Sequence, residues 1–213
     1  MSADPCFVFA KPPVPGQVKT RIGACTGHDT AARIAAALLS DTVRLVRSVD
    51  ALRPVLSTPE PTSDHGLVAA VAVQDQGGGD LGARLERTLR AGLATSAKAI
   101  AIGADAPHVP REHLAQALVA LDAHDAVLGP TSDGGFYLLG LRWCPDGLLA
   151  DLPWSAPTTA HATRTRLVER GLTVAALPPW WDVDELADLR RFVAEVEVGA
   201  APATHAVLAT LSL

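Results

Sequence analysis

The sequence predicts an α/β fold in which helices flank a mostly parallel β-sheet. Short runs rich in Val, Ile and Leu alternate with longer stretches of helical period along the chain. Polar and glycine-rich segments follow several of these runs, and ligand sites of open α/β sheets lie in such loops. No internal repeat or linker divides the 213 residues. We therefore expect one domain over residues 1–213, with a short helical tail from about residue 199.

The apolar runs are predicted to be strands because they are short and rich in branched residues. The run at 99–102 is the most apolar and is expected at the centre of the sheet. A turn at Asp133-Gly134-Gly135 separates the fifth and sixth runs. The predicted strands are 6–10, 54–57, 71–73, 99–102, 126–128, 136–141 and 173–177.

Helical periodicity predicts five helices between these strands. Asp29 is a candidate N-cap for the first and Asp80 for the second, since a carboxylate at this position accepts from free backbone N–H groups. Asp184 stands at the start of the last helix and could be its N-cap. The predicted helices are 30–49, 81–93, 113–121, 158–170 and 184–196.

Composition excludes several functional classes. The chain has 18 Lys and Arg against 23 Asp and Glu, so the broad basic surface of a nucleic-acid or anionic-membrane binder is absent. No apolar run reaches the roughly 18 to 20 residues that span a bilayer, and the N-terminus lacks a signal-peptide pattern. We expect a cytoplasmic protein. Three widely spaced cysteines without a CxxC pair argue against a disulfide framework or a zinc site.

The segment 11–21 concentrates positive charge in an acidic protein. Lys11, Lys19 and Arg21 flank a proline-stiffened loop, and Gly16 allows backbone to approach a ligand. Cations and free N–H groups together suit phosphate. The loop fits neither the Walker A pattern nor GxGxxG. An ordinary solvated loop is the alternative.

The segment 74–84 places glycines at the start of a predicted helix, where N–H groups can contact a base or a phosphate. Gln76 and Arg84 are its candidate side-chain partners. The alternative is a flexible connection that Asp80 caps.

Carboxylates follow two further strands. Asp105 ends the most apolar strand, and a divalent cation that bridges it to a diphosphate would offset the cost of burying its charge. Asp182 and Asp184 form a second candidate ligand pair. Helix capping is the alternative for Asp105 and Asp184. The Asp133-Gly134-Gly135 segment is at least a turn.

The order of these motifs resembles a bacterial family of small GT-A-like proteins. The motifs are K-P-P-V-P-G-Q-V-K-T-R, G-D-L-G-A-R, I-G-A-D-A-P, G-P-T-S-D-G-G-F-Y, P-W-S and D-V-D-E-L-A-D-L, over about residues 7–195. Members are described as nucleotide-diphospho-sugar transferases or glycosyltransferases, and some are associated with arsenosugar biosynthesis. The K-T-R loop, D-G-G turn and final D-V-D also resemble small nucleotidylyltransferases that load phospholactate or sugar acids onto nucleotides.

The resemblance implies a Rossmann-like GT-A domain and a role for each motif. Lys19 and Arg21 would lie at the phosphates, and Gly82 and Arg84 near the nucleotide. Asp105 would be the main ligand of Mg²⁺ or Mn²⁺ and Asp184 the second, with Asp182 a weaker choice. The residues that would face the acceptor or sugar are Asp133, Gly134, Gly135, Trp154 and Ser155. Because Ala106 follows Asp105, this chain has no DxD pair.

The expected function is glycosyl transfer from a nucleoside diphosphate sugar to a small acceptor, with Lys19, Arg21 and Asp133 as the catalytic side chains. The partners are then a nucleotide or nucleotide sugar and a small-molecule acceptor. Nucleotidylyl transfer from an NTP to a small phosphate or carboxylate substrate is the first alternative. A nucleotide-binding protein without activity is the second, because fold alone does not establish catalysis.

Overall fold

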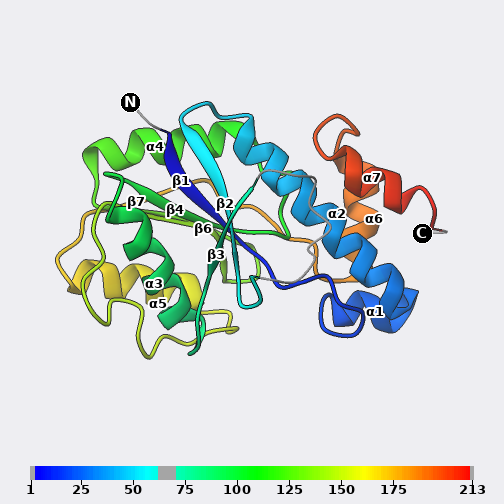
Figure 1. The fold of residues 1–213 in the computed structure, drawn as a ribbon, viewed down its shortest axis with the longest axis horizontal. Coiled ribbons are helices and arrows are strands. Elements are labelled where there is room, and N and C mark those ends of the chain that lie inside the picture. Colours follow the sequence, from blue (N-terminus) through cyan, green and yellow to red (C-terminus); the bar gives the residue numbers. More distant parts are fainter. Residues whose placement is uncertain (1–2, 62–70, 212–213) are drawn as a thin grey trace.

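A seven-stranded sheet forms the centre of the computed structural model, which describes residues 3–61 and 71–211 (Figure 1). The strand order is β3-β2-β1-β4-β6-β5-β7. The strands are β1 Asp4–Phe9, β2 Leu52–Thr58, β3 Ala72–Asp75, β4 Ala99–Gly103, β5 Ala126–Pro130, β6 Phe136–Leu141 and β7 Val174–Ala176.

The sheet is mostly parallel, as the sequence predicts. β1 pairs in parallel with β2 and β4, β2 with β3, and β5 with β7. Only β6 runs against its neighbours β4 and β5 among the described strands. β1, β4, β5 and β7 therefore all end at the same edge of the sheet, so the loops that follow them meet there.

Helices cover both faces of the sheet. The helices are α1 Thr20–Thr26, α2 His28–Arg47, α3 Leu81–Leu93, α4 Arg111–Ala123, α5 Thr159–Glu169, α6 Leu186–Glu195 and α7 Pro202–Leu208. Alternation along β4 separates the two cores: Ile100 and Ile102 pack with α2 and α4, whereas Ala99 and Ala101 pack with α3 and α5. None of the helices in these described ranges is both long and apolar enough to cross a membrane.

A third core joins the end of the chain to α2. Ile34 and Leu38 of α2 pack with Phe192 of α6 and Leu208 of α7. The buried carboxylate of Asp41 accepts hydrogen bonds from the N–H and the hydroxyl of Thr204, both at 2.7 Å. The helix α7 lies beside α6 at the end of the molecule away from α3 and α5 (Figure 1).

Three details differ from the sequence predictions. The helix α1 was not predicted, because Gly23 and Thr26 weaken its pattern and it spans only seven residues. Gly27 rather than Asp29 is the N-cap of α2, and Asp29 lies in the first turn. The helix α6 begins after Glu185, so Asp184 is not its N-cap. Asp80 does cap α3, accepting from the Ala83 N–H at 2.9 Å.

Candidate active site

Charged side chains from four loops meet where the parallel strands end. Lys19 comes from the loop after β1, Asp105 follows β4, Asp133 follows β5, and Asp182 and Asp184 follow β7. The topology thus unites residues that lie up to 165 positions apart in the sequence, as Lys19 and Asp184 show.

Lys19 is the centre of this cluster. Its Nζ lies 3.3 Å from Asp105 Oδ2 and 3.6 Å from Asp184 Oδ1, and its side chain is only 13% exposed. Burial alone would lower the pKa of Lys19, but the two carboxylates outweigh it and raise the pKa above its ordinary value. The lysine is therefore held as a buried cation between two anions.

The backbone at Lys19 is part of the arrangement. Its φ of 43° is left-handed, an unusual conformation for a residue other than glycine. The residue directly precedes α1, so the bend turns the chain from the proline loop into the helix. Backbone strain of this kind is common at ligand sites.

Arg21 extends the cluster toward solvent. Its guanidinium contacts Asp184 Oδ2 at 2.9 Å and Glu185 Oε1 at 3.2 Å. The arginine side chain is 67% exposed, so these pairs add little stability and the group is available to a ligand.

Asp182 adds a fourth carboxylate. Burial, and then the nearby charges of Asp105 and Asp133, raise the pKa of Asp182 to about 6. The resemblance at the sequence level favours Asp184 over Asp182. The structure places the Asp182 side chain near the carboxylates of Asp105 and Asp133. The D-V-D spacing indicates that Asp182 and Asp184 lie together, because residues i and i+2 of an extended segment share a face.

Two cavities meet at this cluster. The loop cavity, of about 600 Å³, is lined by Lys11, Val18, Lys19 and Gly103 among others. The turn cavity, of about 520 Å³, is lined by Asp133, Gly135, Phe136, Trp154 and Asp182 among others. Four residues line both cavities: Arg21, Asp105, Ser155 and Asp184. The carboxylates and Arg21 thus stand at the junction of two spaces, each large enough for part of a substrate.

The D-G-G segment is both a turn and a wall of the turn cavity. Asp133 Oδ1 accepts from the Thr131 hydroxyl at 2.5 Å and from the Gly135 N–H at 3.0 Å. Gly134 has φ of 93°, and a Cβ there would overlap the Pro157 carbonyl oxygen. The turn therefore packs tightly on the Pro157 loop, which fixes Asp133 at the cavity.

The segment 74–84 contributes only Leu81 to the two cavities. The buried Gln76 amide donates to the Ser57 carbonyl at 2.7 Å, and Arg84 Nε donates to the Gly79 carbonyl at 2.9 Å. A Cβ at Gly82 would overlap the Leu149 carbonyl oxygen, so this glycine permits close packing. Gly16, Gln76, Gly82 and Arg84 are not among the residues that line either cavity.

The donor set suits a hard divalent cation held partly by substrate. Asp105 and Asp184 approach the same ammonium group, so their oxygens converge. Mg²⁺ binds through one or two carboxylates and completes its shell with water and phosphate oxygens. Residues 3–61 and 71–211 contain no group of three or more His, Cys, Asp or Glu side chains arranged to hold a metal alone. Two carboxylates plus a diphosphate is the arrangement that these residues fit.

Comparison with known proteins identifies the family. Residues 30–156 match the family described as "Uncharacterized protein conserved in bacteria (DUF2064)". The chain belongs to this family. No curated protein matches the sequence.

Solved structures support the same fold. A protein from Desulfovibrio desulfuricans G20, named provisionally as a nucleotide-diphospho-sugar transferase, is 28% identical over 99% of this chain and 95% of its own, with a TM-score of 0.86. A CMP:2-keto-3-deoxy-manno-octonic acid synthetase complexed with CTP is 12% identical over 91% and 98%, with a TM-score of 0.57. The 2-C-methyl-D-erythritol 4-phosphate cytidylyltransferase of Thermus thermophilus is 15% identical over 96% and 100%, with a TM-score of 0.54. The family member therefore has the GT-A-like transferase fold that the sequence predicts.

Proposed function

We propose that this DUF2064 member is a metal-dependent glycosyltransferase that moves a sugar from a nucleoside diphosphate to a small acceptor. The observation that carries the proposal is the junction of the loop cavity and the turn cavity at Asp105, Asp184 and Arg21. One cavity presents cations and the other presents a carboxylate and aromatic walls. A donor diphosphate and an acceptor need such unlike surroundings on either side of the reacting bond.

In this proposal the loop cavity holds the diphosphate. Lys19 and Arg21 contact its oxygens and stabilise the negative charge that develops on the leaving group, while Lys11 lines the same cavity. Asp105 and Asp184 would hold Mg²⁺ or Mn²⁺, and the cation would supply Lewis-acid neutralisation of the diphosphate. When a phosphate binds, the Lys19 ammonium exchanges carboxylate contacts for phosphate contacts, and the two aspartates become available to the cation.

The turn cavity holds the sugar and the acceptor. Asp133 serves as the base that accepts the proton of the acceptor hydroxyl. Its Oδ1 is engaged by Thr131 and Gly135, which orients the carboxylate and leaves Oδ2 for substrate. Trp154 packs edge to face on Phe136 and forms one wall, and Ser155 stands at the junction. Gly135 lines the cavity beside them, whereas Gly134 holds the turn in place.

Nucleotidylyl transfer is the second candidate. The cationic loop would then hold the β- and γ-phosphates of a triphosphate, and a substrate phosphate or carboxylate in the turn cavity would attack the α-phosphorus. The fold that this chain shares with a synthetase complexed with CTP and with a cytidylyltransferase is compatible with this second candidate. Likeness to the D. desulfuricans protein over nearly the whole of both chains favours sugar transfer.

Product analysis separates the two reactions. The protein is incubated with Mg²⁺ or Mn²⁺, with common nucleotide sugars or triphosphates, and with small hydroxyl, phosphate and carboxylate acceptors. Glycosyl transfer releases a nucleoside diphosphate, because the bond between the anomeric carbon and the diphosphate breaks. Metal-dependent release of pyrophosphate from a triphosphate, with no diphosphate from any sugar nucleotide, would overturn the first proposal in favour of the second.

A further inference from the structure

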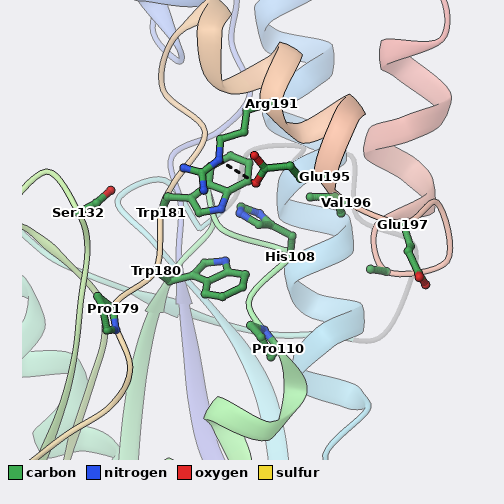
Figure 2. A pocket seen from close by; sticks show the side chains of 11 residues that line it. His108, Pro110, Ser132, Pro179, Trp180, Trp181, Arg191, Glu195, Val196 and Glu197 are labelled. Atoms are coloured by element: carbon green, nitrogen blue, oxygen red, sulfur yellow. Dashed lines mark hydrogen bonds and ion pairs between the residues drawn. The ribbon is translucent and has the colours of Figure 1, made fainter.

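A third cavity lies behind the candidate active site. This aromatic pocket, of about 530 Å³, is lined by His108, Trp180, Trp181, Arg191 and Glu197 among others. Figure 2 shows His108 between the two tryptophans, with Arg191 and Glu195 of α6 beside Trp181. Its volume is in the range of small-molecule sites. The transfer chemistry proposed above uses none of these side chains.

The pocket shares a wall with the turn cavity. Trp180 and Trp181 line the aromatic pocket, and the next residue, Asp182, lines the turn cavity. Ser132 lines the pocket while Asp133 lines the turn cavity. The Ser132 N–H donates to the Trp180 carbonyl at 2.9 Å, so the two segments of the wall are joined.

Three nitrogen atoms in the wall of this pocket have no hydrogen-bond partner within the described part of the chain. Both ring nitrogens of His108 and the indole Nε1 of Trp180 are buried without a hydrogen bond. His108 itself is only 7% exposed. Burying a nitrogen without a hydrogen bond costs free energy, and an apolar residue of similar size would fill the same space without that cost. The unpartnered nitrogens therefore point to a ligand.

Charge narrows the class of ligand. Arg191 already pairs with Glu195 at 2.9 Å and lies 4.2 Å from the centre of the Trp181 ring. Glu197 adds a second carboxylate to the lining. Burial, and then Arg191, lower the pKa of His108 to about 3, so the imidazole is neutral at pH 7. The pocket thus carries a net negative charge and disfavours phosphates.

Hydroxyl groups match the remaining requirements. A neutral imidazole needs one donor and one acceptor, and an indole N–H needs an acceptor. A hydroxyl both donates and accepts, so neighbouring hydroxyls of one ring satisfy both side chains once Trp180 and His108 move apart to admit them. The apolar C–H face of a sugar ring also packs on an indole face.

We propose that the aromatic pocket is a second binding site, separate from the transfer site, for a neutral carbohydrate ring. Trp180 is the stacking platform, His108 and Glu197 are hydrogen-bond partners, and the Arg191–Glu195 pair closes one side. Binding here involves no nucleotide or metal and does not depend on which reaction the transfer site performs.

The test is saturation-transfer NMR and tryptophan fluorescence on the full chain, without nucleotide or metal. The probes are D-glucose, D-galactose, D-mannose and N-acetyl-D-glucosamine, with AMP as the anionic comparison. At least one sugar is expected to saturate, whereas any AMP binding belongs to the cationic transfer site and is expected to be unchanged in Trp180→Ala. Trp180→Ala is expected to weaken the sugar at least about tenfold, which is the loss of a stacking contact of about 1.4 kcal/mol. The matched control Trp143→Phe, at an exposed ring outside the pocket, should leave affinity unchanged.

A second variant keeps the test decisive if Trp180→Ala does not fold. Ala200 is an exposed residue of the lining, so Ala200→Phe fills the pocket without removing any core side chain. It should abolish sugar binding. Three results would each overturn the proposal: no sugar of the panel saturates; AMP binding is lost in Ala200→Phe; or sugar binding survives Ala200→Phe, in which case its loss in Trp154→Phe would place the sugar in the turn cavity.

Discussion

The candidate active site and the aromatic pocket meet at residues 178–184, and they differ in whether their central polar groups have partners. On one side Lys19 lies between Asp105 and Asp184, so every central charge has a partner. On the other side His108 and Trp180 bury nitrogens that lack partners among the described residues. In the two proposals above, the paired cluster would exchange its partners for phosphate and metal, whereas the unpaired nitrogens would bind a neutral donor and acceptor.

The largest effect is expected on the charged side of the wall. Asp105→Asn should lower the rate of metal-dependent transfer at least about 100-fold, because the amide loses the charge that holds the cation and faces Lys19. Steady-state kinetics with the nucleotide that proves to be the substrate measures this. Asp146→Asn, at an exposed carboxylate that lines neither cavity, is the control. An unchanged rate in Asp105→Asn would remove Asp105 from the site.

The Asp133-Gly134-Gly135 turn should not tolerate a side chain at Gly134. Gly134→Ala adds a Cβ that would clash with the Pro157 carbonyl and forces alanine into a left-handed φ, so unfolding free energy should fall by about 2–3 kcal/mol. Urea denaturation measures it. Gly199→Ala is the matched control, since a Cβ there meets nothing within 4 Å. Equal stability of the two variants would show that the turn is looser than described.

Lys19, which is buried, should contribute more to diphosphate affinity than Arg21, which is exposed. Lys19→Ala should weaken a nucleoside diphosphate by about 1.5–3 kcal/mol and the bare nucleoside far less, because the lost contacts are charge-assisted. Arg21→Ala should have the same selectivity with a smaller loss, since its side chain is 67% exposed. Calorimetric titration compares the two ligands, with Lys98→Ala as a control at a cation paired elsewhere, with Asp122. Equal losses for nucleoside and diphosphate would place both cations away from the phosphates.

The free energy of unfolding should decrease in acid because of His108 in the aromatic pocket. Burial lowers the pKa of His108 to about 3 from 6.5, so the unfolded chain takes up a proton below pH 6.5 and the folded chain does not. Stability is therefore lost as the pH falls, by about 2 kcal/mol between pH 6.5 and 5. His108→Leu should remove this slope in urea denaturation, and His161→Leu, at an exposed position, should keep it. A slope that persists in His108→Leu would assign it to another group.

Asp182, in the candidate active site, should give the free energy of unfolding an opposite and smaller dependence on pH. Its pKa of about 6 in the folded chain exceeds the ordinary value of 3.8, so the native state holds a proton more tightly than the unfolded state. Stability then falls as the pH rises from about 4 to 6, and the loss persists above that. Asp182→Asn should recover about 1 kcal/mol at pH 7.5 but not at pH 4, measured in EDTA to exclude metal. A gain of equal size at both pH values would argue for repacking instead.

The sequence predicts the sheet and the charged cluster better than it predicts their detail. The runs at 6–10 and 99–102 are apolar enough to predict buried strands, and parallel topology then brings Lys19, Asp105 and Asp184 to one edge. The seven-residue α1 lacks a clear period. Gln76 and Arg84 were predicted near the nucleotide, but the structure places them outside both cavities, because the backbone carbonyls of Ser57 and Gly79 engage their side chains.

The aromatic pocket was beyond the reach of the sequence for a different reason. Tryptophan fills cores as readily as it lines ligand sites, so Trp180 and Trp181 carried no signal by themselves. His108 meets them only through the fold, since 72 residues separate it from Trp180. Pro179, Trp180 and Trp181 line the pocket in succession, and Asp182 then lines the turn cavity, so the side on which each residue lies does not follow from a simple alternation in the sequence.

The central claim is that Asp105, Asp184 and Lys19 form one centre for a metal and a diphosphate. The most direct measurement is a crystal structure grown with Mn²⁺ and a nucleoside diphosphate, with the Mn²⁺ located by its anomalous scattering. We expect an anomalous peak coordinated by carboxylate oxygens of Asp105 and Asp184, with the diphosphate in the loop cavity against Lys19 and Arg21. A diphosphate bound in the aromatic pocket, or a Mn²⁺ peak that touches neither aspartate, would contradict it.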